Sequence, residues 1–176
     1  EDVMMRYVKS LITLLCVSCL CVLLVACGRS DGIVGNKYKA IYKNKVEAIV
    51  EFKDNGDLVY TVAEGAFDAG REEHGKYEVI EENGKKLLLT TGIYDSKFFS
   101  IEDRDTHLTG TNIEENKGGK EITWEIFNLK LENTKVNLKQ VEFKKNPDKV
   151  NINRDEIKDL EVIESQNDNR ILEKTN

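Results

Sequence analysis

The sequence predicts an all-β protein: an antiparallel up-and-down barrel or meander of eight or nine short strands, followed by a short C-terminal helix. Two observations support this prediction. Apolar and polar residues alternate in short runs, as they do in strands with one buried face. The runs are separated by turn signals, of which Asn55-Gly56 and Asn83-Gly84 are the clearest. An Asn-Gly pair favours a hairpin because it supplies the positive φ angles of a two-residue turn.

The strands are expected within one domain over residues 36–146. A chain of 176 residues with 40% hydrophobic content can bury one core. Strands joined by such short turns most simply close into a barrel or pack as a sandwich. The expected strands are 38–42, 46–52, 58–62, 77–80, 87–91, 98–101, 108–113, 121–131 and 136–143.

Two of these segments change the face on which their apolar residues lie. In 121–131, Trp124 and Ile126 share one parity, whereas Phe127 and Leu129 share the other. Segment 136–143 shows the same change. The sequence therefore predicts a β-bulge near Ile126-Phe127, or a strand that bends from one part of a barrel to another.

The chain after the strands is predicted as a linker with a short amphipathic helix over 147–165. Asn153 followed by Glu156 is a capping-box pattern. Ile157, Leu160 and Ile163 then fall on one helical face. Residues 166–176 are polar and are expected to form a frayed tail.

Residues 1–26 have the organisation of a secretory signal peptide. Arg6 and Lys9 give a basic start, residues 11–25 carry no charge, and Ala26 provides a small residue before polar sequence returns. This uncharged run is short for a transmembrane helix, which needs roughly 20 residues. Residues 1–3 precede the pattern and are interpreted as extraneous to it.

The end of this segment, Leu24-Val25-Ala26-Cys27, resembles the lipobox of bacterial lipoproteins. The resemblance implies cleavage by signal peptidase II between Ala26 and Cys27, a lipid on the Cys27 sulfur, and residues 27–35 as a tether. Two or more acyl chains hold a domain durably on a membrane. The chain is therefore expected on the extracytoplasmic face of the cell membrane, or on the outer membrane if the host has two.

This assignment also accounts for the cysteines. Cys16, Cys19 and Cys21 lie in the signal segment, and Cys27 is the lipidation site. A thiolate metal site in the mature chain is therefore not expected, and no cofactor is expected either.

The strand region resembles the small lipocalin-like domains of bacterial lipoproteins over residues 35–145. The similarity rests on Gly35-x-x-Tyr38, Val50-x-Phe52-x-x-Asn55-Gly56, Gly75-x-Tyr77, Lys86-Leu87-Leu88-Leu89, Phe99-x-Ile101 and Leu108-x-Gly110. It implies a calyx-like barrel that holds a small apolar ligand. The residues themselves favour a barrel filled by its aromatic side chains, because eight strands leave an interior just wide enough for them.

Catalytic, metal-binding and nucleic-acid-binding classes find little support. His74 follows Glu72 and Glu73, but this spacing matches no compact metal motif, and both His74 and His107 are expected on the surface. No mature serine stands in a Gly-x-Ser-x-Gly elbow, and no phosphate-binding loop is present. A net charge of -6 argues against nucleic acid. A non-enzymatic protein is expected.

Two functions remain open from the sequence. The first is an interaction or binding module, whose filled barrel presents its loops and an apolar patch at Ile157, Leu160 and Ile163 to another envelope protein. The alternative is a hollow lipocalin-like carrier of a small apolar ligand or lipid. The irregular, charged loop over 63–75 is the best candidate for a partner contact or a lid.

Overall fold

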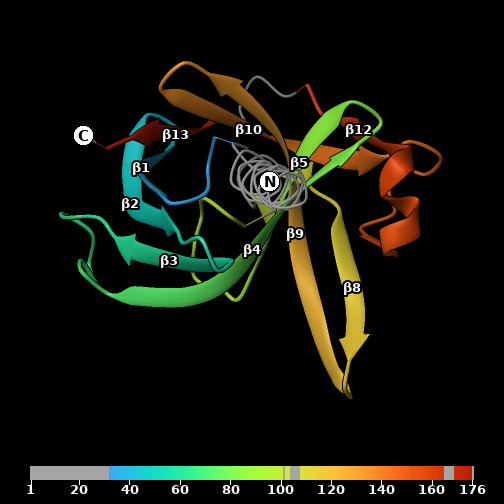
Figure 1. Ribbon diagram of the computed structural model, residues 1–176, viewed down its shortest axis with the longest axis horizontal. Coiled ribbons are helices and arrows are strands. Elements are labelled where there is room, and N and C mark those ends of the chain that lie inside the picture. The colour runs from blue at the N-terminus through green and yellow to red at the C-terminus, as the bar shows by residue number, and fades with distance from the viewer. Residues whose placement is uncertain (1–31, 101, 104–107, 165–168, 176) are drawn as a thin grey trace, which may run out of the picture. The chain divides into compact units, whose positions relative to one another are not determined.

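A computed structural model describes residues 32–100, 102–103, 108–164 and 169–175. Residues 33–176 form one compact unit. Strands make up most of the described residues of this unit, and helix is limited to one short element (Figure 1). The prediction of an all-β fold is confirmed.

Eight of the described strands close into an antiparallel barrel. Each pairs with the next, and the last returns to the first, so the barrel has no open sheet edge. The strands, in order around the barrel, are β1 (Asn36–Tyr42), β2 (Lys45–Phe52), β3 (Asp57–Val62), β4 (Glu72–Glu82), β5 (Lys85–Thr91), β9 (Lys120–Glu132), β10 (Lys135–Phe143) and β13 (Arg170–Lys174).

The remaining described elements lie outside this closed ring. β8 (Asn112–Lys117) forms a hairpin with β9 that reaches beyond the barrel (Figure 1). β11 (Asn151–Ile152) pairs in parallel with β8, and β12 (Leu160–Val162) pairs with β10. The 3-10 helix η1 (Arg154–Asp159) stands between β11 and β12, while β6 (Glu102–Asp103) and β7 (Leu108–Thr109) form a separate ribbon.

The hairpin turns differ in how they reverse the chain. Asn83 and Gly84 have φ angles of 51° and 73°, as the sequence predicts for a two-residue turn. At the other predicted turn only Gly56 has a positive φ, of 83°. There the Asn55 side-chain oxygen accepts a hydrogen bond from the Asp57 N–H at 3.1 Å. Asn55 therefore stabilises this turn by a side-chain hydrogen bond and not by a positive φ angle.

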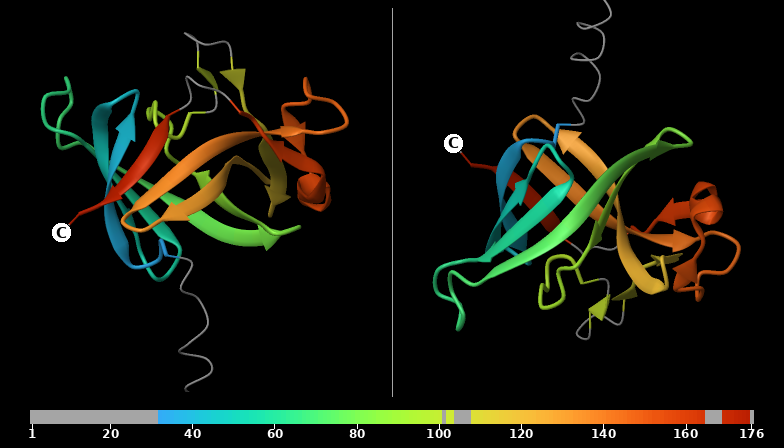
Figure 2. Two further views of the ribbon diagram at one scale, coloured as in Figure 1. Left: turned by 90° about the horizontal axis from the view of Figure 1, so that it is seen from above. Right: turned by 60° about the horizontal axis from the view of Figure 1, so that its bottom comes forward.

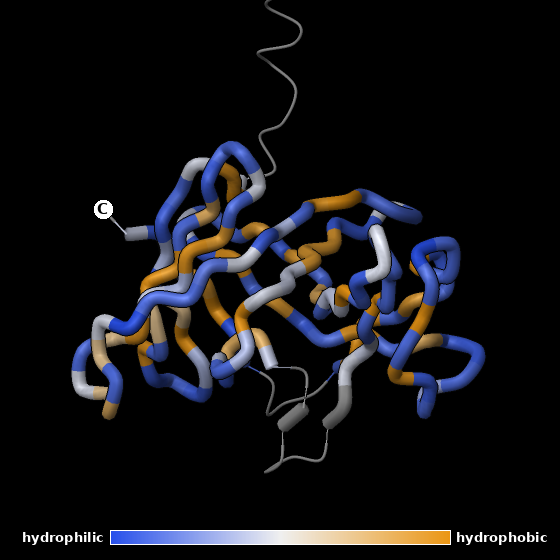
Figure 3. Tube along the Cα trace, turned by 90° about the horizontal axis from the view of Figure 1, so that it is seen from below, coloured by the Kyte–Doolittle hydropathy of each residue, from blue (hydrophilic) through white to orange (hydrophobic). Residues whose placement is uncertain are grey.

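Side chains fill the barrel interior. The Phe52 ring meets those of Tyr38 and Tyr77 edge to face, with centroids 5.9 and 5.0 Å away. Phe98 and Phe99 lie 5.0 Å apart and are both fully buried in the same core. The expectation that aromatic side chains fill the barrel is confirmed for these residues. Apolar positions alternate with polar ones along the strands in Figure 3.

A second core lies on the outer face of the wall formed by β5, β9 and β10. Leu88 and Phe127 belong to the interior core, whereas their neighbours Leu89 and Ile126 belong to this second one. The elements outside the ring cover it with Ile113, Ile152, Ile157 and Leu160. A wall buried on both faces needs apolar residues on both parities. The pairing of β5 with β9 runs without a shift in register, so the predicted bulge near Ile126-Phe127 is wrong.

Residues 170–174 correct the prediction of a frayed tail over 166–176. They form β13, which closes the barrel between β1 and β10. Arg170 and Leu172 are buried, whereas Ile171 and Glu173 are half-buried. The strand is short and largely polar, so its local sequence pattern does not reveal it. Pairing with neighbours along both edges satisfies its backbone groups.

The predicted C-terminal helix is shorter than expected. The Glu156 carboxylate accepts a hydrogen bond from the Asn153 N–H at 2.9 Å, in keeping with the predicted cap, but η1 ends at Asp159. Leu160 begins β12 and, with Ile157, is buried in the second core, while Ile163 is half-buried. These residues therefore do not form the predicted apolar surface patch, because Ile157 and Leu160 are buried in the second core, where Leu160 lies opposite Phe143 of β10.

Two other predicted strands are also corrected. Segment 98–101 is a turn as far as it is described, which allows the adjacent side chains of Phe98 and Phe99 both to enter the core. Segment 108–113 is divided between β7 and β8.

Candidate functional site

The two ends of the barrel differ in the length of their connections. At the N-terminal end, Asn36 begins β1 opposite Phe52, and the turns after β2, β4 and β9 are short. The opposite end carries the connections that follow β3, β5 and β10, which are longer. We call it the long-loop end. The two ends face in opposite directions in the left view of Figure 2.

The loop 63–71 joins β3 to β4 at the long-loop end. Its base is fixed by a hydrogen bond from the Gly70 N–H to the Val62 carbonyl at 3.0 Å. The Arg71 N–H donates to the Asp68 carbonyl, also at 3.0 Å. Phe67 lies within the loop that the first of these bonds closes and is fully exposed. The loop thus presents an aromatic ring to solvent, although burial of such a ring is strongly favourable.

Arg71 links this loop to the segment that follows β5. Its guanidinium contacts Asp68 in the loop, Glu73 of β4 at 2.7 Å and Asp95 at 3.4 Å. The Glu73 carboxylate also accepts a hydrogen bond from the Tyr94 N–H at 2.8 Å. Tyr94 is 87% exposed. Phe67 and Tyr94 are therefore each followed by an acid, Asp68 or Asp95, that forms an ion pair with Arg71.

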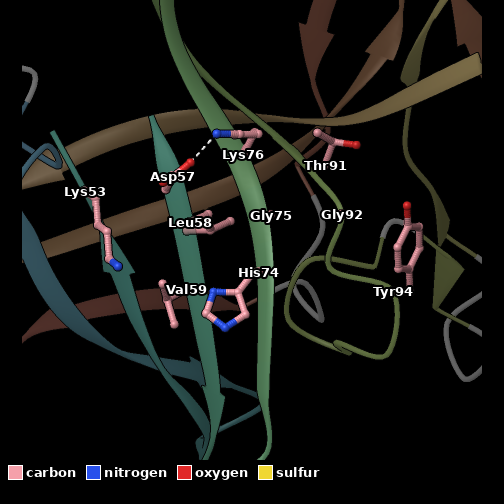
Figure 4. Close-up of a pocket in the computed structure, with 10 residues that line it drawn as sticks. All are labelled: Lys53, Asp57, Leu58, Val59, His74, Gly75, Lys76, Thr91, Gly92 and Tyr94. Atoms are coloured by element: carbon pink, nitrogen blue, oxygen red, sulfur yellow. Dashed lines mark hydrogen bonds and ion pairs between the residues drawn. The ribbon is translucent and has the colours of Figure 1, made fainter. Parts of the chain in front are cut away.

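A groove of about 370 Å³ lies beside this network, between the β3–β4 wall and residues 91–94 (Figure 4). The two backbones come close at Gly75 and Gly92. A Cβ atom on Gly75 would lie 2.2 Å from the Thr91 carbonyl oxygen, and one on Gly92 would lie 3.0 Å from the Gly75 Cα. Glycine at both positions is what allows this approach.

The charged side chains of the groove are mostly basic. Lys53, His74 and Lys76 line it together with Asp57. Lys76 donates a hydrogen bond to Asp57, and this contact, with help from the Asn55 amide, holds the pKa of Asp57 below its ordinary value. These described lining residues can form hydrogen bonds and ion pairs with a ligand, but they do not include a nucleophile paired to a base.

Ile93, Phe98 and Phe99 of the segment that follows β5 lie in the interior core, and Arg170 binds the backbone of this segment. Arg170 is 1% exposed and donates hydrogen bonds to the carbonyls of Phe98 and Ser100, both at 2.8 Å. Its guanidinium also lies over the rings of Tyr42 and Phe127, at 5.0 and 5.5 Å. Arg170 was missed from the sequence because it lies in the segment expected to be a tail.

Glu125 is a second residue that sequence reasoning missed. Burial raises its pKa to about 7. It shares the parity of Phe127 and Leu129, which line the barrel interior, and that parity was the available signal. The alternation alone does not show how deeply a carboxyl at the end of such a face is buried.

Several predicted site residues lie outside the described parts of the chain. These are Ala26 and Cys27, the cleavage and lipidation residues, and His107. His74 lies on β4, where its exposed side chain is 3.6 Å from Glu72. In the described ranges, no three His, Cys, Asp or Glu side chains gather closely enough to hold a metal ion. In the same ranges, no helix has the length and apolar character needed to cross a membrane.

Comparison with known proteins gives one likeness of fold. The crystal structure of a DUF4909 family protein from Staphylococcus aureus subsp. aureus Mu50 superimposes with a TM-score of 0.59 and 12% sequence identity. The match covers 81% of this chain and 97% of that chain. At this identity the likeness bears on the fold alone. No family model and no curated protein sequence matches the chain.

Proposed function

We propose that this chain is a lipid-anchored, extracytoplasmic binding module that takes hold of a protein partner at its long-loop end and catalyses no reaction. The lipobox-like Leu24–Cys27 supports the anchor, with the lipid on Cys27. The tether proposed for residues 27–35 joins the barrel at Asn36, which begins β1 at the end opposite the long-loop end.

The observation that carries the proposal is the pair Phe67 and Tyr94. Both rings are exposed, and each is followed in the sequence by an acid that forms an ion pair with Arg71, Asp68 after Phe67 and Asp95 after Tyr94. Aromatic anchors held in place before binding cost little conformational entropy when they are buried by a partner. Because acids flank both rings, the partner surface is expected to combine an apolar pocket with a basic rim.

The interior packing favours surface binding over the lipocalin-like carrier. Phe98 and Phe99 are fully buried where an apolar ligand would have to lie, and Arg170 fixes the carbonyl of Phe98. A ligand of any size would have to displace these side chains and break that hydrogen bond. Removing large buried aromatic side chains from a core costs about 3–5 kcal/mol.

Site-specific photo-cross-linking in the native host tests the binding end. A photoreactive phenylalanine analogue replaces Phe67 in one variant, Tyr94 in a second, and the exposed turn residue Asn83 at the N-terminal end in a control. We expect the first two variants to form the same discrete cross-linked species and the control to form none. Cross-links at position 83 alone, or at none of the three positions, would refute the proposal.

The anchor is tested separately with Cys27→Ala. We expect this variant to remain as unprocessed precursor and to lose the lipid label, because the sulfur that receives the lipid is gone. A Cys19→Ala variant is the matched control and is expected to be processed normally. Normal processing of Cys27→Ala would show that residues 1–26 are not a lipoprotein signal.

A further inference from the structure

A row of polar side chains crosses the barrel wall toward the long-loop end. Thr90 of β5 lies opposite Glu125 of β9, and Glu125 lies opposite Asn112 of β8. Residues directly opposite each other in antiparallel strands share a face, with Cβ atoms about 4.5–5.5 Å apart. This is the interior face, because Leu88 and Phe127, two residues along β5 and β9, belong to the interior core.

Two polar atoms of this row are buried without hydrogen-bond partners among the described residues. Thr90 is 0% exposed, and its Oγ1 accepts and donates no hydrogen bond. The Oδ1 of Asn112 is also buried without a hydrogen bond. Glu125 is desolvated, and only its own backbone N–H favours the ionised form. Each buried polar group left unpaired costs about 1–3 kcal/mol, so two such atoms beside a desolvated carboxyl indicate a missing partner.

Groups on the surrounding elements do not supply that partner. Tyr77 of β4 lies opposite Thr90, but its hydroxyl donates to the Lys53 carbonyl at 2.8 Å. Glu114, two residues along β8 from Asn112, is exposed and carries the same charge as Glu125. Arg170 lies over the Phe127 ring and donates to the carbonyls of Phe98 and Ser100.

We propose that Thr90, Glu125 and Asn112 bind the primary ammonium group of a small ligand. The row offers three acceptors: a carboxylate, an amide oxygen and a hydroxyl oxygen. A primary ammonium offers three N–H donors and a positive charge that pairs with the carboxylate. A Ca²⁺ ion takes about 6–8 oxygen ligands, more than these three side chains supply.

The row also leads from the interior to solvent. Thr90 is fully buried, Glu125 and Asn112 are half-buried, and Asn151 of β11, the partner of Asn112, is exposed. A ligand that enters from the β11 side meets the carboxylate and the amide before it reaches the threonine. The site does not depend on the proposed contact at Phe67 and Tyr94.

The probe for this site is methylammonium, with tetramethylammonium as a matched cation that has no N–H donor. Residues 28–176 contain the whole compact unit and are used for backbone amide NMR. We expect methylammonium to produce saturable shifts at Glu125, Asn112 and Thr90 near pH 8, and tetramethylammonium to produce none. Near pH 6 the dissociation constant is expected to rise about tenfold, because most of the Glu125 carboxyl is then protonated.

Two variants complete the test. Glu125→Gln keeps the shape of the side chain and is expected to abolish the shifts, whereas Glu114→Gln on the neighbouring strand is expected to leave them unchanged. Equal binding of the two cations, or binding that survives Glu125→Gln, would overturn the proposal. An absence of methylammonium shifts in the folded wild type would also overturn it and would assign the row to bound water alone.

Discussion

The guanidinium of Arg71 lies 3.4 Å from the carboxylate of Asp95 and joins the β3–β4 loop to the segment that follows β5. Both partners also have local contacts: Arg71 binds Asp68, and the Asp95 N–H lies within 3.4 Å of the Glu73 carboxylate. The backbone next to each exposed aromatic residue is therefore tied to the same guanidinium, directly or through Glu73.

Arg71→Ala is expected to loosen the loop without unfolding the barrel. Exposed ion pairs contribute about 0–1 kcal/mol, so the melting temperature should change little, while amide hydrogen exchange over residues 63–71 should accelerate. Hydrogen exchange with mass spectrometry measures this effect. Lys130→Ala removes the exposed pair with Glu132 and serves as the control. Unchanged protection of the loop in Arg71→Ala would contradict the role given to the guanidinium.

Phe99→Ala is expected to destabilise the protein by about 3–5 kcal/mol, because it opens a cavity in the filled interior. Phe67→Ala is the same substitution at an exposed position and is expected to change stability by about 0.5 kcal/mol or less. Urea denaturation of both variants gives the comparison. Similar stabilities for the two would mean that the segment around Phe99 does not belong to the core.

Gly75→Ala is expected to destabilise the β4 wall by about 1–3 kcal/mol through overpacking, since the new Cβ would lie 2.2 Å from the Thr91 carbonyl oxygen. His74→Ala, at the adjacent exposed position, is the control and should be nearly neutral. Thermal denaturation distinguishes them. An unaltered melting temperature in Gly75→Ala would show that residues 91–94 do not lie against β4 as described.

Glu125 is expected to make stability fall as pH rises. Its folded pKa of about 7 is above the ordinary value of 4.5, so the folded state binds more protons than the unfolded state between these values. The free energy of unfolding begins to fall near pH 4.5 and has lost about 1–3 kcal/mol above about pH 7.

The comparison that isolates this effect is wild type against Glu125→Gln across that pH range. As pH rises, the wild type should lose unfolding free energy through Glu125, whereas the glutamine variant should not. Parallel curves would mean that the Glu125 carboxyl is hydrated in the folded state. Methylammonium near pH 8 should restore part of the wild-type stability if the proposed ammonium site is occupied.

The barrel was predictable because its signal is local. Alternation and Asn-Gly turns report which residues face a core, and the hairpins from β1 to β5 follow directly from them. The role of β13 was not predictable, because the pairing of Arg170–Lys174 with β1 and β10 depends on sequence-distant partners. The two parities of β9 were visible, but not the second core that explains them.

The candidate site was predictable only in outline. The irregular composition of 63–75 predicted a loop, but only 63–71 is one, because residues 72–75 belong to β4. The structure adds the Arg71 contacts that join this loop to the segment of Tyr94. Glu125 and Thr90 come together only through the pairing of β9 with β5, which skips three intervening strands of sequence. Cross-strand neighbours that are far apart in the chain show no characteristic spacing in the sequence.

Native mass spectrometry of purified residues 28–176, followed by organic extraction, decides most directly whether the barrel binds with its surface or its interior. The packing of Phe98, Phe99 and Arg170 predicts an extract without a stoichiometric apolar molecule. A lipid or other apolar compound retained at one copy per chain would contradict the filled barrel and establish the carrier.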